Sequence, residues 1–267
     1  MAIYACSKKD WLALRQRKKT SHKGENGRLL ILAGSGQYHG SLILAVLAAM
    51  RFCDLVYVHS TGENMGLVKK IKLATPNVIV VQKNRLPEFF AKADTYLVGP
   101  GWEKNNENKR LLIKAIRSKK PVVIDATALY MIKPKMLAQN VVITPHRGEF
   151  KDLFGINANA ENVKSMAKKH GCTILCKGPA DLIASGKRFA INKIHHPGMT
   201  CGGSGDVLAG LLGALLAGHN KLFEASCAAC YLNGLAGMLL AKKMGVHYAA
   251  SDIAGKLPYA ASEVEKG

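Results

Sequence analysis

Short, continuous apolar runs alternate along the chain with helical patterns. The runs have the length and residue types of buried strands and lie at residues 28–34, 55–60, 78–82, 95–99, 121–125 and 141–145. Between them, residues 41–52 form an apolar helical pattern and residues 105–120 a largely polar one. Unbroken apolar strands that alternate with helices predict a mainly parallel sheet with helices on both faces.

The pattern changes in the last third of the chain. Residues 172–178, 181–185 and 188–191 predict three short adjacent strands, so we expect a mixed sheet at one edge. Helical patterns follow at residues 205–217 and 223–244, and a shorter one at 250–257. Because no linker, low-complexity tract or internal repeat interrupts this order, residues 1–267 are predicted to form a single domain.

In a sheet of this kind ligands bind at the carboxyl ends of the strands. The loops that follow the predicted strands are therefore the place to look for chemistry. They are residues 34–40, 99–101, 125–129, 144–149 and 177–180.

Composition and cysteine usage favour a globular protein of the cytoplasm. Hydrophobic residues make up 48% of the chain, its amino-terminal segment has no apolar core of a secretory signal, and the apolar runs at 42–50 and 207–217 are too short to cross a bilayer. We expect no membrane partner. Seven cysteines, an odd number scattered along the chain, argue against a disulfide framework. Cys227 and Cys230 form a CxxC inside a helical pattern and are interpreted as small core residues.

The formal net charge is +20, from 38 basic and 18 acidic residues. Such a charge is typical of nucleic-acid-binding proteins, and this function stays open as an alternative. The charges are spread along the chain, however, and the one dense cluster, residues 15–23, has no aromatic residues to stack on bases. The charge equally favours a phosphate-rich small molecule.

The sequence GGSGD at residues 202–206 opens a strongly apolar helix. Unpaired amides and the dipole at a helix start form an anion site, which glycines leave open to close approach. A carboxylate at Asp206 would repel a bound phosphate, so its presence favours a general base that faces a hydroxyl attacking that phosphate. The alternative is that Asp206 only caps or charge-stabilises the helix start. Spacing alone leaves both interpretations open.

Two other strand ends carry candidate groups. His146 and Glu149 follow the strand in "ITPHRGEF" and are well placed for ligand or Mg²⁺ binding. The alternative is a plain helix entry with Thr144 as the cap and Glu149 in the first turn. Lys177 ends a strand before a Gly-Pro turn, where it could contact phosphate or simply be solvated.

The common nucleotide signatures are absent or incomplete. No GxxxxGK[ST] run occurs, which excludes a P-loop. The sequence GSGQYHG at residues 34–40 is an imperfect dinucleotide fingerprint, and the following strand at 55–60 ends without the acidic residue that would hold a ribose.

Taken together and in this order, six segments resemble the ADP- or ATP-dependent NAD(P)H-hydrate dehydratases of the ribokinase-like superfamily, over residues 15–258. The segments are "SHKGENGRLLILAGSGQYHGSLILA", "VGPGW", "DATAL", "ITPHRGEF", "CKGPADLIA" and "HPGMTCGGSGDVLAG". The resemblance implies a ribokinase-like α/β fold and a lyase that repairs the (S)-hydrate of NADH or NADPH. In that reaction ADP or ATP phosphorylates the ring hydroxyl, Mg²⁺ assists, and loss of phosphate restores the double bond.

The resemblance also implies roles for individual residues. Asp206 is the expected catalytic base, beside an anion hole built from the backbone of Gly202, Gly203, Ser204 and Gly205. With Asp206, the expected contacts to the hydrate are Gly40, Ser41, Gly101, His146 and Glu149. With Gly205, the expected contacts to the nucleotide are Lys177, Gly178, Pro179, Ala180 and Asp181. The metal ligands are not implied.

The chain departs from the family pattern at three of these places. Thr127 stands where the family has the second Asp of DADAL, Ser41 replaces an alanine, and His196 replaces the asparagine before Pro-Gly. Many relatives carry an amino-terminal epimerase domain, which this chain is expected to lack, and homo-oligomers such as tetramers are frequent. The alternative in the same superfamily is a kinase of a vitamin precursor or sugar, which would keep its phosphorylated product. The "HKG" and "TPHRGE" segments favour the dehydratase.

Overall fold

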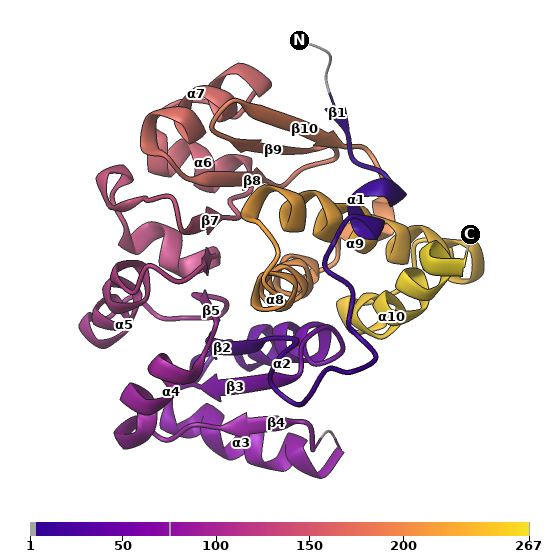
Figure 1. Cartoon of the computed structure of the whole chain (residues 1–267). Helices are drawn as coiled ribbons and strands as arrows, with labels where there is room; N and C mark the ends of the chain where they lie inside the picture. Colours follow the sequence, from indigo (N-terminus) through magenta and orange to yellow (C-terminus); the bar gives the residue numbers. More distant parts are fainter. Residues whose placement is uncertain (1–3, 75, 267) are drawn as a thin grey trace.

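The computed structural model describes residues 4–74 and 76–266. These residues form a ten-stranded sheet with the strand order β1-β10-β9-β8-β7-β6-β5-β2-β3-β4 (Figure 1). The strands are β1 Tyr4–Ala5, β2 Arg28–Leu32, β3 Leu55–His59, β4 Val78–Val80, β5 Thr95–Val98, β6 Val122–Ile124, β7 Val141–Ile143, β8 Thr173–Cys176, β9 Asp181–Ser185 and β10 Arg188–Asn192. The helices are α1 Lys8–Leu12, α2 His39–Ala49, α3 Gly62–Ala74, α4 Leu86–Lys92, α5 Asn106–Arg117, α6 Arg147–Phe154, α7 Ala160–His170, α8 Ser204–Ala217, α9 Leu222–Met244 and α10 Ala250–Lys266.

The strand pairing confirms a mainly parallel sheet that is mixed at one edge. β9 is antiparallel to both β8 and β10, whereas the pairs from β4 through to β8 are parallel. β2 lies between β3 and β5, so the chain moves outward through β3 and β4 and then returns to the other side of β2. This reversal is the kind of place where open α/β sheets leave a crevice at their carboxyl edge.

Alternate residues of the strands enter two separate cores. Leu29 and Ile31 belong to the core that packs under α2, α8, α9 and α10. Leu30 and Leu32 point to the other face and join the core under α4, α5, α6 and α7. Because both faces are covered, the strands are apolar at successive positions rather than at every second one.

The longest helix is a core helix. α9 is long and apolar enough to span a membrane by length and composition, but 67% of that apolar window is buried within the fold. Cys227 and Cys230 lie on it and are fully or almost fully buried, which confirms them as core residues. No cysteine in the described part of the chain is in a disulfide.

Several helix boundaries differ from the predicted ones, most of all in two helices. The helix predicted at 41–52 begins two residues earlier and ends at Ala49. The helix predicted at 250–257 continues to Lys266 and contains Pro258 in its interior. Buried residues on both sides of that proline, such as Ile253 and Val264, hold the helix against α9 despite the missing amide.

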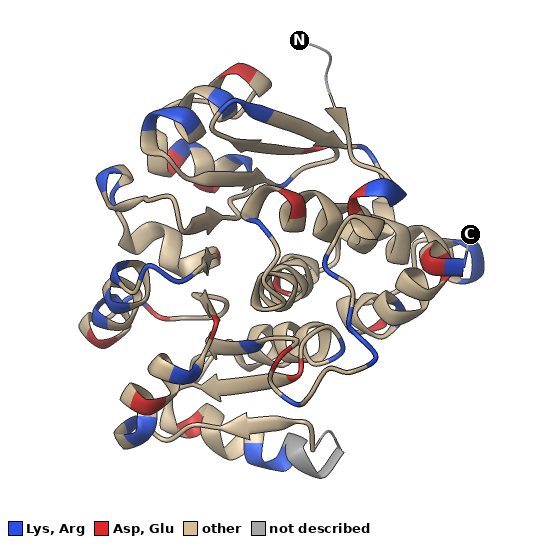
Figure 2. Cartoon of the chain, in the orientation of Figure 1, with Lys and Arg blue, Asp and Glu red and all other residues tan. Residues whose placement is uncertain are grey.

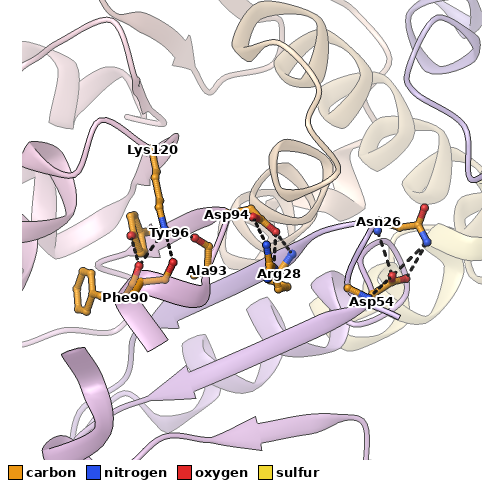
Figure 3. Close-up of polar contacts among 10 residues, drawn as sticks. Asn26, Arg28, Asp54, Phe90, Ala93, Asp94, Tyr96 and Lys120 are labelled. Atoms are coloured by element: carbon orange, nitrogen blue, oxygen red, sulfur yellow. Dashed lines mark hydrogen bonds and ion pairs between the residues drawn. The ribbon is translucent and has the colours of Figure 1, made fainter. Parts of the chain in front are cut away.

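Polar contacts tie together the amino-terminal edge of the sheet (Figure 3). Arg28 donates from its side chain and its amide to Asp94, with all three distances 2.9 Å. Asp54 accepts hydrogen bonds from the amides of Gly24 and Asn26, and these bonds outweigh the effect of burial and lower the pKa of its carboxyl group. The carboxylates of Asp54 and Asp94 therefore have structural roles. The candidate reactive groups lie at the opposite edge of the sheet, where the strands end.

Candidate active site

Helix α8 begins at the carboxyl edge of the sheet, directly behind the glycine-rich turn. Gly203 is the N-cap with a φ of +93°, and a Cβ there would lie 2.3 Å from Leu44 Cδ1, so only glycine fits. The amide of Ser204 donates to the Cys201 carbonyl at 3.4 Å. In the described part of the chain, the amides of Gly205 and Asp206 have no acceptor. With the helix dipole, they supply the free donors that an anion site needs, and the anion site itself stays a prediction.

Asp206 lies in the first turn of α8, and its surroundings favour a protonated carboxyl group. Burial raises its pKa and the carboxylate of Asp125 raises it further, whereas a hydrogen bond from Ser41 and the charge of Lys177 lower it, and the result is about 6. A carboxylate with this pKa can accept a proton close to neutral pH. No side-chain capping bond is present at this helix start, so Asp206 is not the helix cap.

Lys177 connects the anion site to a buried carboxylate. Its amide donates to the Pro145 carbonyl at 2.8 Å, which continues the pairing of β7 with β8 beyond the strand ends. Its Nζ donates to Asp125 Oδ1 at 2.7 Å, and Thr144 Oγ1 donates to the same oxygen at 2.7 Å. A Cβ built on Gly205 would lie 3.2 Å from Nζ, so the ammonium group lies against the start of α8.

The Lys177 side chain stays charged at this place. Burial alone would lower its pKa, but the contact with Asp125 and the nearby carboxylates of Glu149 and Asp206 outweigh burial and raise it. A buried ammonium beside free helix amides is a strong attraction for phosphate oxygens. The structure therefore places Lys177 in the site rather than in solvent.

His146 begins helix α6, and the prediction that Thr144 caps this helix is wrong. The Nδ1 atom of His146 accepts from the amides of Gly148 and Glu149 at 3.0 and 3.1 Å, while Glu149 Oε2 accepts from the His146 amide at 2.8 Å. Thr144 is instead turned inward to Asp125. Because Nδ1 accepts twice, the neutral imidazole carries its proton on Nε2, and this ring is 59% exposed.

The turn after β8 is closed by Asp181. Its Oδ1 accepts from the Gly178 amide at 3.1 Å and its Oδ2 from Asn192 Nδ2 at 3.0 Å. Burial raises the pKa of Asp181 although these bonds oppose the effect. Asp181 therefore shapes the turn between Lys177 and itself.

A pocket of about 260 Å³ joins the turn to the start of α8. The predicted site residues that line it are His146, Lys177, Gly178, Pro179, Asp181, Ser204 and Gly205. The lining residues to which the sequence assigned no role in the site are Ile194, His195, Met199, Thr200, Leu208, Cys230, Asn233 and Gly234. Asn233 and its neighbours come from α9, and no local motif marks them.

The loops after β2 and β5 meet on the other side of Asp206. A Cβ at Gly101 would lie 2.6 Å from the Tyr38 carbonyl oxygen and 2.8 Å from Ser41 Cβ, so the GPG loop lies directly against the start of α2. The Gly34 amide donates to the Pro100 carbonyl at 2.7 Å, which ties the two loops together. Gly40 faces open space. Ser41, Gly101 and Gly40 are thus brought together beside the carboxylate but outside the pocket.

Known proteins share both the sequence and the fold of this chain. The family model described as NAD(P)H-hydrate dehydratase matches residues 29–259. An ADP-dependent (S)-NAD(P)H-hydrate dehydratase of Nitrosopumilus maritimus is 38% identical over 258 residues, which cover 89% of each chain. A ribokinase-like superfamily protein of Enterococcus faecalis superposes with a TM-score of 0.87 at 26% identity, over 98% of this chain and 96% of that one.

A further solved structure is an ADP/ATP-dependent NAD(P)H-hydrate dehydratase of Bacillus subtilis, co-crystallised with ATP and Mg²⁺. It superposes with a TM-score of 0.85 over 99% of both chains, at 24% identity. The fold is therefore ribokinase-like, as the sequence predicts. With a family model that spans most of the chain and a relative of this identity over nearly its whole length, the chain belongs to the NAD(P)H-hydrate dehydratases.

Proposed function

We propose that this chain converts the (S)-hydrate of NADH or NADPH back to the reduced dinucleotide, with ADP or ATP as the phosphoryl donor. The observation that carries the proposal is Asp206. Its carboxyl group has a pKa of about 6 and lies one residue from helix amides that are free to bind phosphate. Membership of the family supports the choice of substrate.

In the first step, Asp206 accepts the proton of the ring hydroxyl. The hydroxyl oxygen attacks the terminal phosphorus of the donor, and the bond from that phosphorus to the bridging oxygen breaks. The amides at the start of α8 and the Lys177 ammonium hold the transferring group. A positioned base contributes roughly 10²–10⁴ in rate, and fixed donors around the phosphoryl group add to this.

In the second step, the phosphate ester becomes a leaving group. The C–O bond breaks and phosphate leaves with its electron pair. The neighbouring ring carbon gives up a proton to the departing phosphate, and the C–H electron pair restores the double bond. The products are the reduced dinucleotide, phosphate, and the donor shortened by one phosphate. The exposed Nε2–H of His146 and the backbone of Gly101 are proposed to hold the substrate during both steps.

Mg²⁺ is proposed to arrive on the nucleotide. Among residues 4–74 and 76–266, no group of three or more ligating side chains is assembled. Asp125 is engaged by Lys177 and Thr144, and Glu149 by the His146 amide, so free carboxylate oxygens are few. This arrangement fits an ion that keeps most of its ligands from phosphates and water, as Mg²⁺ commonly does. The ion would neutralise charge on the transferring phosphate.

We also propose a cytoplasmic, single-domain protein that forms a homo-oligomer, a tetramer being one possibility. The free cysteines fit a reducing compartment. Four of the exposed apolar side chains lie on α9, α10 and the loop between them, namely Met238, Met244, Val246 and Tyr259. Light scattering of the purified protein measures the oligomeric state.

The test is the absorbance at 340 nm of hydrated NADH mixed with the protein, Mg²⁺ and either ADP or ATP. We expect a nucleotide-dependent rise with at least one donor, and comparison of the two identifies the preferred donor. Asp206→Asn, which keeps the shape of the side chain, should lower turnover by about 10²–10⁴ while nucleotide binding persists.

Two results would contradict the proposal. Turnover of Asp206→Asn within a few-fold of the native rate would remove Asp206 from the role of base. No absorbance rise with either donor, in protein that binds nucleotide by calorimetry, would instead indicate a kinase that acts on another alcohol and keeps the phosphate on it.

A further inference from the structure

A second pocket lies at the far end of helix α8 from the glycine-rich turn. Its volume is about 370 Å³, which is within the range of about 300–1,000 Å³ that is typical of small-molecule sites. Its walls come from the segment before β2, the turn after α2, the end of α8 and helix α10. Because α8 has 14 residues, about 20 Å of helix separates this pocket from the candidate active site.

Three arginines line this pocket, and two of them have no acidic partner. Arg15 and Arg51 form no ion pair within the part of the chain that the structure describes. Arg17 lies 3.8 Å from Asp54, whose carboxylate already accepts hydrogen bonds from two backbone amides. Guanidinium groups present paired donors that match phosphate oxygens, so the lining has unused capacity for an anion.

Much of the remaining lining is apolar. Trp11, Leu14 and Leu215 are 6%, 7% and 5% exposed, and Phe52 packs edge-on against Trp11 with the ring centroids 5.7 Å apart. Among the described lining residues Glu265 is the one carboxylate, and its Oε1 accepts a hydrogen bond from the Trp11 indole at 3.1 Å. A ligand with an apolar body and an anionic end matches this combination.

The basic cluster at residues 15–23, which the proposed function leaves unexplained, is anchored on both sides. The Arg15 amide donates to Asn220 Oδ1 at 2.8 Å. Gly27 has a φ of +105°, and a Cβ there would lie 2.4 Å from the Ala217 carbonyl carbon, so the chain lies directly against the end of α8. Because the backbone is fixed before and after the cluster, less chain freedom is lost when a ligand binds.

We propose that this pocket is a second binding site and that it takes a nucleoside monophosphate. The guanidinium groups of Arg15, Arg17 and Arg51 bind the phosphate, and the base packs against the apolar side chains of Trp11 and Leu14. A pocket of this volume holds one nucleotide unit rather than a strand of nucleic acid. The proposal does not depend on the proposed function, because the described lining shares no residue with the candidate active site.

The probe is adenosine 5′-monophosphate, and the readout is tryptophan fluorescence, since Trp11 is one of two tryptophans in the chain. Titration at about 150 mM salt should give a saturable change in native protein and none in Trp11→Phe. Arg15→Gln and Arg51→Gln should each raise the midpoint about tenfold or more, the effect of losing one charged hydrogen bond. Adenosine, which has no phosphate, should bind more weakly by at least as large a factor.

A matched control is Arg110, an exposed arginine of α5 that lies outside this pocket and forms no ion pair among the described residues. Arg110→Gln should keep the native midpoint. Arg15 and Arg51 are also exposed, so all three glutamine variants should fold. Gly205→Val, which crowds the start of α8, should keep the midpoint as well, and this separates the second site from the candidate active site.

Five results would overturn the proposal. Three come from the probe itself: no saturable fluorescence change in native protein, a midpoint that both Arg15→Gln and Arg51→Gln leave unchanged, or a change that disappears in Gly205→Val. Inorganic phosphate that displaces the probe as effectively as the unlabelled monophosphate would show attraction of any anion, without recognition of the base. A single-stranded oligonucleotide that binds in preference to the monophosphate at the same salt would assign the basic cluster to nucleic acid.

Discussion

At the scale of single residues, the site holds charged side chains close together although burial disfavours their charged forms. Asp206 and Asp125 would repel each other, and Lys177 lies close enough to both to reduce that repulsion. The Lys177 ammonium is bonded to Asp125 and not to Asp206, so the carboxylate that we propose as the base keeps its affinity for a proton. Asp125 thus binds the lysine, and Asp206 is left without an ion pair among the described residues and can take up a proton.

The buried carboxyl group of Asp206 should make stability depend on pH. Its pKa of about 6 in the folded protein lies above the usual 3.8, so its contribution to stability is present below pH 3.8 and is lost as the pH rises through 6. The loss is up to about 3 kcal/mol. Asp206→Asn should therefore be more stable than native protein at pH 8, by an amount that vanishes near pH 4. Urea unfolding at both values measures this, and an equal difference at the two would contradict it.

At the scale of elements, the start of α8 must be free of side chains so that a phosphate can approach its amides. Gly205→Val should lower nucleotide affinity by about tenfold or more, the cost of losing one charge-assisted hydrogen bond, because the new side chain displaces the Lys177 ammonium. The protein should still fold, since the displaced atom ends a flexible side chain. Gly255→Val, in open space on α10, is the control that should keep native affinity in calorimetry. Unchanged affinity in Gly205→Val would mean that phosphate binds elsewhere.

The carboxyl-terminal end of α4 has carbonyl groups without helical partners, and the Lys120 side chain donates hydrogen bonds to them (Figure 3). Its Nζ donates to the carbonyls of Phe90, Ala91 and Ala93 at 3.1, 2.6 and 2.6 Å, and burial lowers its pKa. Lys120→Met should reduce the free energy of unfolding by about 1–3 kcal/mol, because three carbonyls lose a charged donor. Denaturant unfolding measures this loss, with Lys109→Met as the control. Lys109 is an exposed lysine of α5, and its substitution should reduce the free energy of unfolding by under about 0.5 kcal/mol.

The elements differ in how readily the sequence predicts them. The buried strands were predicted because both of their faces are covered, which leaves unbroken apolar runs such as residues 28–34. The strand β1 has only two residues, too few for a pattern. The alternative interpretation of "ITPHRGEF" named Thr144 as the cap of α6. The Thr144 hydroxyl instead donates to the buried carboxylate of Asp125, and His146 is the cap.

The same distinction holds within the site. The anion hole and Asp206 were predictable because they are five consecutive residues with one local geometry. The bond between Lys177 and Asp125 joins residues 52 positions apart, and Asn233 comes from a different helix. Such partners become visible only when the sheet order and the packing of α9 are known.

At the scale of the whole molecule, lysines and arginines lie on helices, strands and loops throughout the fold rather than in one segment (Figure 2). A net charge of +20 should attract nucleic acid without sequence preference. We expect duplex DNA to bind only at low salt, with a loss of about 10³–10⁵ in affinity between 50 and 200 mM if six to ten phosphates are contacted. Filter binding measures this, and Asp206→Asn should behave as native. Sequence-selective binding that survives 200 mM salt would favour the nucleic-acid alternative.

The two sides of Asp206 are built by separate parts of the chain. The turn after β8, with α8 and α9, lines the pocket that we propose for the donor. The loops after β2 and β5, tied by the Gly34–Pro100 hydrogen bond, form the side that we propose for the acceptor. Selection could therefore exchange one alcohol for another by altering two short loops, while the phosphate cradle and its base are inherited without change.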